Sequence, residues 1–407
     1  MKVIDGGVTS AKGFYAAAAA AEIKYKGRTD MALIYSEKPC KTAGTFTTNV
    51  VKAAPVKWDR QVVESGVKSQ AVIVNSGIAN ACTGQEGMQY CKETAEKAAE
   101  VLGVDSAGVL VGSTGVIGMQ LPMERIKKGV ELLAQSKEKS RQAGNLAAKA
   151  IMTTDTVEKE VAVQLEIGGK TVTIGGMAKG SGMIHPNMCT MLAYITTDAV
   201  ITKKALQKAL REDVEDTYNM ISVDGDTSTN DTVLLLANGK AKNEKIHIGT
   251  PEYQLFVEAL HYVNETLAKK MAGDGEGATA LFEVKVVNAK TKKQAKTLAK
   301  SVICSNLTKA AIAGHDANWG RILCAMGYSG EMFDPEKVDL YIESKAGKLQ
   351  LIQNGVALDY SETKATEILS QPEMTATADI KEGTEDATAW GCDLTHGYID
   401  INADYRS

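Results

Sequence analysis

The 407-residue sequence lacks features that mark several classes of protein. Its seven cysteines are odd in number and form no Cys-x-x-Cys pair, which argues against a secreted disulfide framework. It has only seven prolines and no Pro- or Ser-rich tract, so no flexible linker is indicated. No run of about 18 apolar residues occurs, and we therefore expect no membrane-spanning helix.

The charges are also balanced rather than clustered. There are 46 basic and 50 acidic side chains, a net charge of −4, and no dense basic block. This argues against a nucleic-acid-binding protein, which would present concentrated positive charge. Asp5, Lys12 and Glu22 interrupt the alanine-rich N-terminus, so it does not match a secretion signal. We expect a cytoplasmic protein.

Strand-type and helix-type patterns alternate along the chain. Alternating apolar residues on both sides of Gly168-Gly169 predict a hairpin. Residues 71–77 are predicted to form a buried strand leading into a turn, and 108–118 a strand followed by a glycine-rich turn. Periodicity and turn residues also predict helices over 85–102, 202–219 and 251–271.

A fresh pattern begins near residue 283. It predicts a helix near 291–303, a hairpin at Asn354-Gly355, another helix near 361–370, and then strands to the C-terminus. Hairpins mixed with helix-separated strands favour an α+β layered fold, and we place a domain boundary near residue 283.

Three familiar kinds of site fit the sequence poorly. Glycines 112, 115 and 118 are followed by Met119, where a phosphate-binding loop needs lysine. His185 and Cys189 are separated by Pro186, which disturbs the single helical face that a zinc pair at this spacing requires. The Gly-Ser-Gly-Met segment lacks the Gly-x-Ser-x-Gly elbow of a serine hydrolase.

A calcium loop is the fourth alternative. Asp224, Asp226, Ser228 and Asn230 have the spacing of the first ligands of an EF-hand. The positions that need glycine and glutamate hold Thr229 and Leu235 instead. A polar loop between two strands is the better interpretation.

Thr190, in the segment AKGSGMIHPNMCTMLAY (178–194), suggests another chemistry. A hydroxyl needs a base to become a nucleophile, and an N-terminal threonine carries one in its own α-amine, with a reference pKa of about 7.7–8.0. An internal threonine reaches this state if it attacks the preceding carbonyl and the resulting ester is hydrolysed. A glycine-rich approach before a buried strand can hold such a strained peptide.

The segment KGSGMIHPNMCTMLAYITTDA (179–199) resembles the cleavage site of the ornithine acetyltransferase family, the self-cleaving acyltransferases of arginine biosynthesis. Further segments resemble the family in the same order along almost the whole chain: GGVTSAKGF (6–14), NSGIANACTG (75–84), STGVIG (113–118), IMTTDT (151–156), GDGEGAT (273–279), DANWGR (316–321) and INADYRS (401–407).

This resemblance implies an αββα layered sandwich over residues 1–283, with a smaller C-terminal α/β domain over 284–407 completing the substrate site. It implies cleavage between Cys189 and Thr190, giving fragments 1–189 and 190–407 that assemble as an α2β2 heterotetramer. Cys189 departs from the family's usual alanine, Ile78 from its usual asparagine, and Ala280 from a common lysine.

The resemblance also implies roles for individual residues. Thr190 is the expected nucleophile, and Thr114 and Gly115 are expected to form the oxyanion hole. Lys179 can pair with an α-carboxylate and Glu276 with a side-chain amine. The full set of expected substrate-binding positions is Thr153 (or its neighbour Thr154), Lys179, Thr190, Glu276, Asn402 and Ser407.

The implied reaction moves the acetyl group of N-acetylornithine to glutamate, and some family members also accept acetyl-CoA. We expect no metal and no organic cofactor, because the threonine itself carries the acyl group. Two alternatives stay open at this point. One is a self-cleaving aminopeptidase or amidase, in which water replaces glutamate, and the other is an uncleaved binding protein.

Overall fold

The computed structural model describes residues 1–185 and 191–403, which form two compact units. The described residues of unit 1 are 1–180, 191–219 and 227–267, and those of unit 2 are 181–185, 220–226 and 268–403. The domain boundary expected near residue 283 stays a prediction.

Unit 1 contains two sheets that share the long strand β3 (Met31–Phe46). The N-terminal half of β3 pairs with β2 and β4, and its C-terminal half pairs with β10. The first sheet contains β1 (Lys2–Ile4), β6 (Lys159–Ile167), β7 (Lys170–Lys179), β8 (Leu192–Thr197) and β10 (Thr232–Ala237). The second contains β2 (Phe14–Ala19), β4 (Ser69–Asn75) and β5 (Val109–Ser113).

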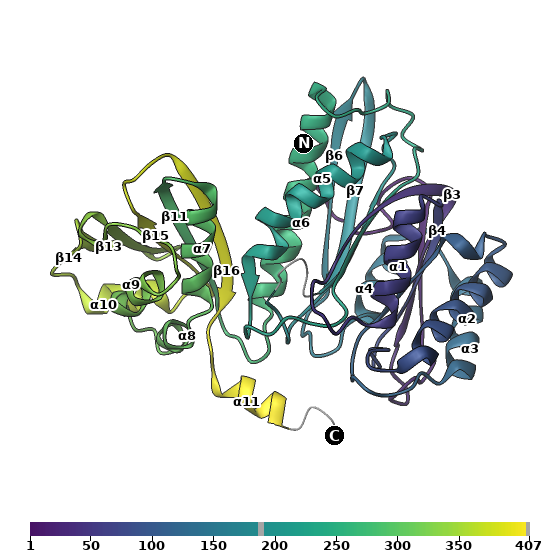
Figure 1. The fold of residues 1–407 in the computed structure, drawn as a ribbon, viewed down its shortest axis with the longest axis horizontal. Helices are drawn as coiled ribbons and strands as arrows, with labels where there is room; N and C mark the ends of the chain where they lie inside the picture. Colours follow the sequence, from purple (N-terminus) through teal and green to yellow (C-terminus); the bar gives the residue numbers. More distant parts are fainter. Residues whose placement is uncertain (186–190, 404–407) are drawn as a thin grey trace. The chain divides into compact units, whose positions relative to one another are not determined.

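Helices cover the outer faces of these two sheets (Figure 1). On the first sheet, α5 packs against β3, and Leu267 of α6 lies over Gly176 of β7. On the second sheet, α2 packs against β4 and β5, and α3 against β2 and β3. The helices are α1 (Ala54–Ser65), α2 (Gly84–Leu102), α3 (Met123–Ser136), α4 (Arg141–Ala150), α5 (Lys203–Asp216) and α6 (Pro251–Gly273).

The side-chain alternation of the strands explains the layers. In β4, Val72 and Val74 point into the core between the sheets, which also holds Tyr194 of β8. Ala71 and Ile73 point the other way, into the core beneath α2 and α3. Because successive strand residues face opposite sides, one apolar strand serves two cores. The predicted α+β layered sandwich is confirmed.

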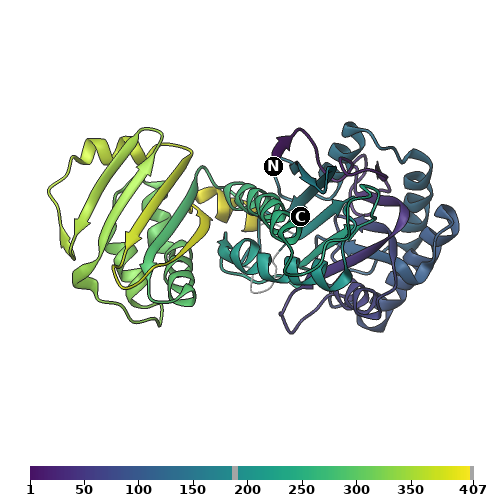
Figure 2. The same cartoon turned by 90° about the horizontal axis from the view of Figure 1, so that it is seen from above.

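Unit 2 is built on a separate sheet of its own, whose strands lie side by side in Figure 2. Helices α7 and α10 pack on this sheet. Its strand order is β14 (Val356–Ala357), β13 (Gly347–Gln353), β12 (Asp339–Ser344), β15 (Glu373–Asp379), β11 (Leu281–Ala289), β16 (Glu385–Cys392) and β9 (Ile221–Ser222). The helices are α7 (Lys292–Ile303), α8 (Asn306–Ala313), α9 (Trp319–Gly327), α10 (Glu362–Leu369) and α11 (His396–Ala403).

Most of the predicted elements are confirmed. β6 and β7 form the hairpin at Gly168-Gly169, whose positive φ angles of 57° and 70° suit glycine. The turn at Asn354-Gly355 joins β13 to β14 as expected. Helices α2, α5, α6, α7 and α10 lie where periodicity placed them.

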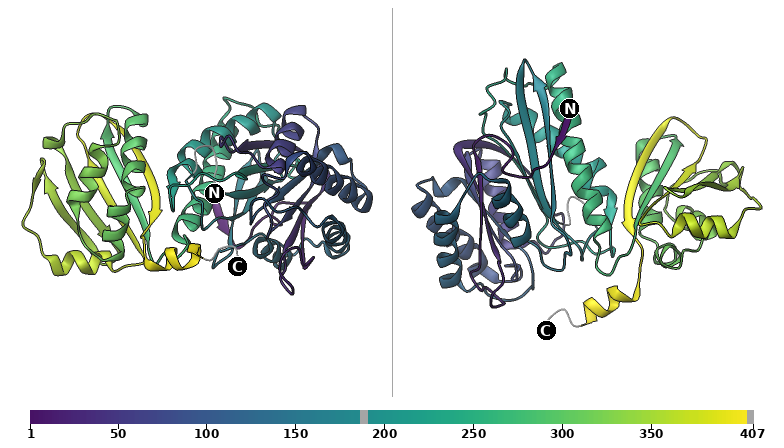
Figure 3. Two further views of the ribbon diagram at one scale, coloured as in Figure 1. Left: turned by 60° about the horizontal axis from the view of Figure 1, so that its bottom comes forward. Right: turned by 180° about the vertical axis from the view of Figure 1, so that it is seen from behind.

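The prediction of strands up to the C-terminus is wrong, because helix α11 follows β16 and occupies the last described residues, 396–403 (Figure 3). Ile399 and Ile401 alternate with polar residues, which mimics a strand pattern. Local side-chain bonds favour the helix instead: the Thr395 hydroxyl accepts from the Gly397 N–H, and the Asn402 side chain donates to the Tyr398 carbonyl. No helix among the described residues is both long and apolar enough to cross a membrane.

Candidate active site

Thr114 and Gly115 lie in the turn that follows β5. Strand β5 runs parallel to β4, with Ser113 opposite Asn75, so the loops after both strands leave the same edge of the sheet. The Thr114 N–H donates to the Asn75 carbonyl at 3.0 Å, and the Val116 N–H donates to the Gly77 carbonyl at 3.1 Å. The turn is therefore held against the neighbouring loop on both sides of Gly115.

Gly115 can only be glycine at this place. Its φ angle is +128°, and an added Cβ atom would lie 2.3 Å from the Gly77 carbonyl carbon. Within the described part of the chain, the Gly115 N–H and the Thr114 hydroxyl have no hydrogen-bond partner. The turn thus offers two adjacent donors that can bind an oxyanion.

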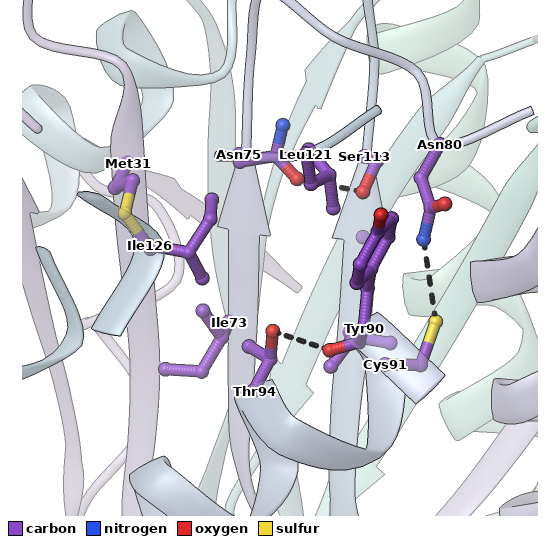
Figure 4. Close-up of a pocket in the computed structure, with 12 residues that line it drawn as sticks. Met31, Ile73, Asn75, Asn80, Tyr90, Cys91, Thr94, Ser113, Leu121 and Ile126 are labelled. Atoms are coloured by element: carbon purple, nitrogen blue, oxygen red, sulfur yellow. Dashed lines mark hydrogen bonds between the residues drawn. The ribbon is translucent and has the colours of Figure 1, made fainter. Parts of the chain in front are cut away.

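Asn75 fixes the base of this turn. Its side-chain oxygen accepts from the Ser113 hydroxyl at 2.6 Å (Figure 4), and its amide donates to the Ile78 carbonyl at 2.9 Å. Asn75 and Ser113 also line a cavity, together with both polar and apolar side chains, whose volume is only about 10 Å³. That volume holds at most one water molecule, so this cavity is not a substrate site.

Thr153 and Lys179 are brought together at the end of β7. The Lys179 ammonium donates to the Thr153 hydroxyl at 2.9 Å and lies 3.8 Å from the Asp155 carboxylate. The same carboxylate pairs with Lys159 at 2.8 Å and accepts the Gly180 N–H at 2.7 Å. Sequence reasoning missed Asp155, although it stands in the quoted IMTTDT segment.

The electrostatics of this cluster favour an anionic ligand. Burial raises the pKa of Asp155, but the positive charges of Lys179 and Lys159, with the hydrogen bonds, outweigh it and bring the pKa to about 2. Asp155 is therefore ionised at neutral pH. The Asp155 carboxylate faces two buried ammonium groups, and two positive charges close together favour an anionic group beside them.

In unit 2, Glu276 and Asn402 are in contact. The Asn402 amide donates to the Glu276 carboxylate at 2.7 Å, and the Glu276 N–H donates to the Ser181 carbonyl at 3.0 Å. Glu276 is 6% exposed. A Cβ atom on Gly182 would lie 2.3 Å from the Glu276 carboxylate, so the glycine gives this group its space.

Three of the expected site residues, Cys189, Thr190 and Ser407, lie outside the described residues. Met191 is the first described residue after Thr190. It is bonded to the start of β10, since the Thr232 N–H donates to the Met191 carbonyl at 2.8 Å. Strand β8, which begins next, runs parallel to β10.

The motifs that the sequence argued against have structural roles. The Asp224 carboxylate accepts the N–H groups of Met183 and Ile184 within unit 2, as part of a polar loop between β9 and β10. The His185 ring lies 3.1 Å from the Ser222 hydroxyl, and burial followed by the Lys300 charge lowers its pKa to about 4. Across residues 1–185 and 191–403, no three His, Cys, Asp or Glu side chains gather in a metal-binding cluster.

Comparison with known proteins places these features in a family. The ArgJ family model matches residues 15–407. The chain belongs to the ArgJ family. It is 51% identical to the arginine biosynthesis bifunctional protein ArgJ of Caldanaerobacter subterraneus, over 407 residues and all of both chains. It is 52% identical to the protein of the same name from Symbiobacterium thermophilum, again over all of both chains.

Membership in the ArgJ family confirms the resemblance drawn from the sequence and the assignment to an enzyme of arginine biosynthesis. Among solved structures, the arginine biosynthesis bifunctional protein ArgJ of Bacillus halodurans matches with a TM-score of 0.51 and 43% identity. The match covers 53% of this chain and 99% of that chain.

Proposed function

We propose that this ArgJ-family chain is a self-processing acetyltransferase that moves the acetyl group of N-acetylornithine to glutamate. The observation that carries the proposal is the match to the ArgJ family over residues 15–407. Because the relatives are named bifunctional, we also propose acetyl-CoA as a second acetyl donor.

The first step is self-cleavage. The Thr190 hydroxyl attacks the Cys189 carbonyl, the acyl group moves from nitrogen to oxygen, and water hydrolyses the ester. The products are fragments 1–189 and 190–407, and the free α-amine of Thr190 becomes the base for later turnovers. The Bacillus halodurans chain supports this step, since nearly all of it matches only about half of this chain. A fragment 190–407 would have that length.

Turnover is a two-step exchange on Thr190. The α-amine takes the hydroxyl proton, the oxygen attacks the acetyl carbonyl of N-acetylornithine, and ornithine leaves with the proton on its amine. Glutamate then attacks the acetyl-threonine ester, which restores the hydroxyl. The Thr114 hydroxyl and the Gly115 N–H stabilise the oxyanion of each tetrahedral intermediate.

Charged side chains select an amino-acid substrate. Lys179, supported by Thr153, binds the α-carboxylate, and the contact between their side chains favours Thr153 over Thr154 for this role. Glu276 binds the side-chain amine of ornithine, and Asn402 orients the Glu276 carboxylate. Ser407 completes the set as a proposal from the sequence.

The remaining assignments rest on the family resemblance. They are an α2β2 heterotetramer, a cytoplasmic location, a C-terminal domain after residue 283 that completes the substrate site, and chemistry that needs neither metal nor organic cofactor.

Purified protein tests the reaction. Incubation with N-acetylornithine should release more than one ornithine per active site only when glutamate is present, because without it each Thr190 is acetylated once and turnover stops. Continued release without glutamate would indicate the aminopeptidase or amidase alternative, and no release would indicate a binding protein. A further arm with acetyl-CoA as the sole donor should give N-acetylglutamate if the chain is bifunctional.

Cleavage has its own test. Denaturing electrophoresis should resolve two fragments, and N-terminal sequencing of the second should begin Thr-Met-Leu-Ala. Thr190→Ala should stay intact and inactive, whereas Thr190→Ser should retain part of both activities. A fully active wild type that remains a single chain would contradict the mechanism.

A further inference from the structure

The Asn230 side chain, which no role above uses, makes a set of buried hydrogen bonds beside the Thr114–Gly115 turn. Its amide nitrogen donates to the Ala79 carbonyl at 2.6 Å and to the Ser113 carbonyl at 2.8 Å. Its oxygen accepts from the Thr229 hydroxyl at 2.6 Å. Only the NH2 end can donate to two carbonyls, so the orientation of this amide is fixed by its partners.

These two carbonyls bracket the turn. Ser113 directly precedes Thr114, and the Ala79 N–H donates to the carbonyl of Val116, which directly follows Gly115. Asn230 therefore restrains the backbone on both sides of the two oxyanion donors. It is 7% exposed and does this from a distant part of the chain, 117 residues from Ser113 and 151 from Ala79.

The same segment also holds the strand that follows Thr190. Two residues after Asn230, the Thr232 N–H donates to the Met191 carbonyl at 2.8 Å, and Thr232 pairs with Leu192 in the parallel register of β10 and β8. Residues 230–232 thus contact both the oxyanion turn and the residue next to Thr190 in the chain.

We infer that Asn230 is a positioning residue, which holds the Thr114–Gly115 turn in place relative to β8, the strand that follows Thr190 in the sequence. The inference rests on the proposed function, because it needs Thr190 as nucleophile and Thr114 and Gly115 as donors. Asn230 touches neither substrate nor reacting atoms in this scheme. Its effect is geometric, and a displacement of about 1 Å between reacting groups can cost about 100-fold in rate.

The variant Asn230→Asp keeps the size of the side chain and removes its donors when the new carboxyl is ionised. A carboxylate would also face two carbonyl oxygens, so the turn should move. We expect kcat for acetyl transfer to fall about 100-fold, with KM changed by less than about threefold, because oxyanion stabilisation acts on the transition state. Self-cleavage of the precursor should slow in parallel.

The pH dependence provides a signature that a general loss of structure would not give. A protonated carboxyl regains one donor, so the ratio of wild-type to variant kcat should shrink as pH falls. Asp231, the next residue in the chain, is titratable too, and burial raises its pKa well above its usual value. It is present in wild type and variant alike, so its own titration appears in both pH profiles.

Asn238 provides a matched control at the other end of β10. It is 8% exposed, and its amide also donates twice, to the Lys12 carbonyl at 2.9 Å and the Ser36 hydroxyl at 3.2 Å. Asn238→Asp makes the same exchange at similar burial and should leave kcat within about threefold of wild type. Equal losses of kcat in the two variants, or a ratio that does not vary with pH, would overturn the inference.

Thr229 offers a second route if Asn230→Asp does not fold. Thr229→Val removes the hydroxyl that orients the Asn230 amide and should lower kcat about tenfold, whereas Thr229→Ser keeps the hydroxyl and should restore it. A Thr229→Val protein with wild-type kcat would contradict the inference. If the wild type cleaves but transfers no acetyl group, the proposed function fails, and the cleavage rates of these variants still decide the role of Asn230.

Discussion

Asp155 in unit 1 and Glu276 in unit 2 are both buried carboxylates, but their partners differ. Asp155 is paired with Lys159 at 2.8 Å, lies 3.8 Å from Lys179, and accepts backbone N–H bonds. Among the described residues, the Glu276 carboxylate is bonded to the Asn402 amide and to no cation. The first carboxylate is paired with lysines of the protein, whereas the second has no cationic partner among residues 1–185 and 191–403.

This difference indicates that the Glu276 carboxylate is the better candidate for binding a cationic ligand. A buried carboxylate without a cation is costly, and a substrate ammonium group would supply the missing charge. In the Asp155 cluster, the Lys179 ammonium also donates to the Thr153 hydroxyl. The Asp155 cluster thus presents ammonium groups, and the Glu276 region presents a carboxylate.

The largest expected effect comes from breaking the paired carboxylate. Asp155→Asn removes the carboxylate that the Lys159 and Lys179 ammonium groups face and should lower the free energy of unfolding by about 3–5 kcal/mol. Chemical denaturation measures this change. Asp334→Asn is the control, because Asp334 also pairs with a lysine, Lys337, but at the exposed surface; it should have no measurable effect. Equal stability of Asp155→Asn and wild type would show that the cluster is not a structural ion pair.

The same carboxylate predicts an acid limb of stability. The folded-state pKa of Asp155 is lowered to about 2, below the unfolded value of about 3.9. Its stabilising contribution is therefore present above pH of about 4 and is lost as the pH falls toward 2. Denaturation curves collected across this window should show wild type losing more stability than Asp155→Asn does.

The unpaired carboxylate should respond in binding rather than in stability. Glu276→Gln keeps the bond to Asn402 but removes the charge, so we expect KM for N-acetylornithine to rise about 100-fold with little change in unfolding free energy. Glu283→Gln is the matched control in the same unit. Glu283 already pairs with Lys285 and Lys269, so its neutralisation should affect stability and leave KM unchanged. The reverse result would contradict the assignment of Glu276.

A change at Asn402 should also raise KM for N-acetylornithine, but by less than Glu276→Gln does. Asn402→Ala removes the one described hydrogen bond that orients the Glu276 carboxylate, and KM should rise about tenfold. Asp400→Ala, an exposed change on the same helix, should leave KM unchanged. A Glu276→Gln, Asn402→Ala double variant should show less than the sum of the two single effects, because both act on one group.

How much of the structure can be predicted from the sequence depends on how far apart the interacting residues lie in the chain. The hairpin at Gly168-Gly169 and the amphipathic helices follow from neighbours in the chain, and those predictions are confirmed. Helix α11 was missed because Ile399 and Ile401 alternate like strand residues, while the bonds that favour a helix depend on side-chain geometry.

The candidate active site is harder to predict from the sequence than the fold, because its residues are far apart in the chain. Thr114, Lys179 and Glu276 were found only through a family resemblance, and their roles stay proposals. Asp155 was missed because its partner Gly180 lies 25 residues away. Asn230 stands in the calcium-like spacing of residues 224–230, but its bonds to Ser113 and Ala79 require the sheet of β2, β4 and β5 to pack beside the segment that leads into β10. No local pattern encodes those contacts.

The smallest predicted effect concerns a carboxylate whose partner can itself titrate. Asp213 of α5 lies 2.6 Å from the His261 ring of α6, and this hydrogen bond is the main reason that the pKa of His261 is raised. A raised folded-state pKa means that the contribution to stability is fully present below the unfolded pKa of about 6.5 and is lost as the pH rises through the folded value. Because the His261 side chain is 42% exposed, solvent screens the pair and the change in stability should be modest.

Thermal denaturation of wild type and His261→Gln from pH 5 to pH 9 measures this change. The two curves of stability against pH should converge at high pH, which is opposite in direction to the acid limb of Asp155. A difference that grows with pH would mean that the Asp213–His261 contact does not stabilise the charged ring.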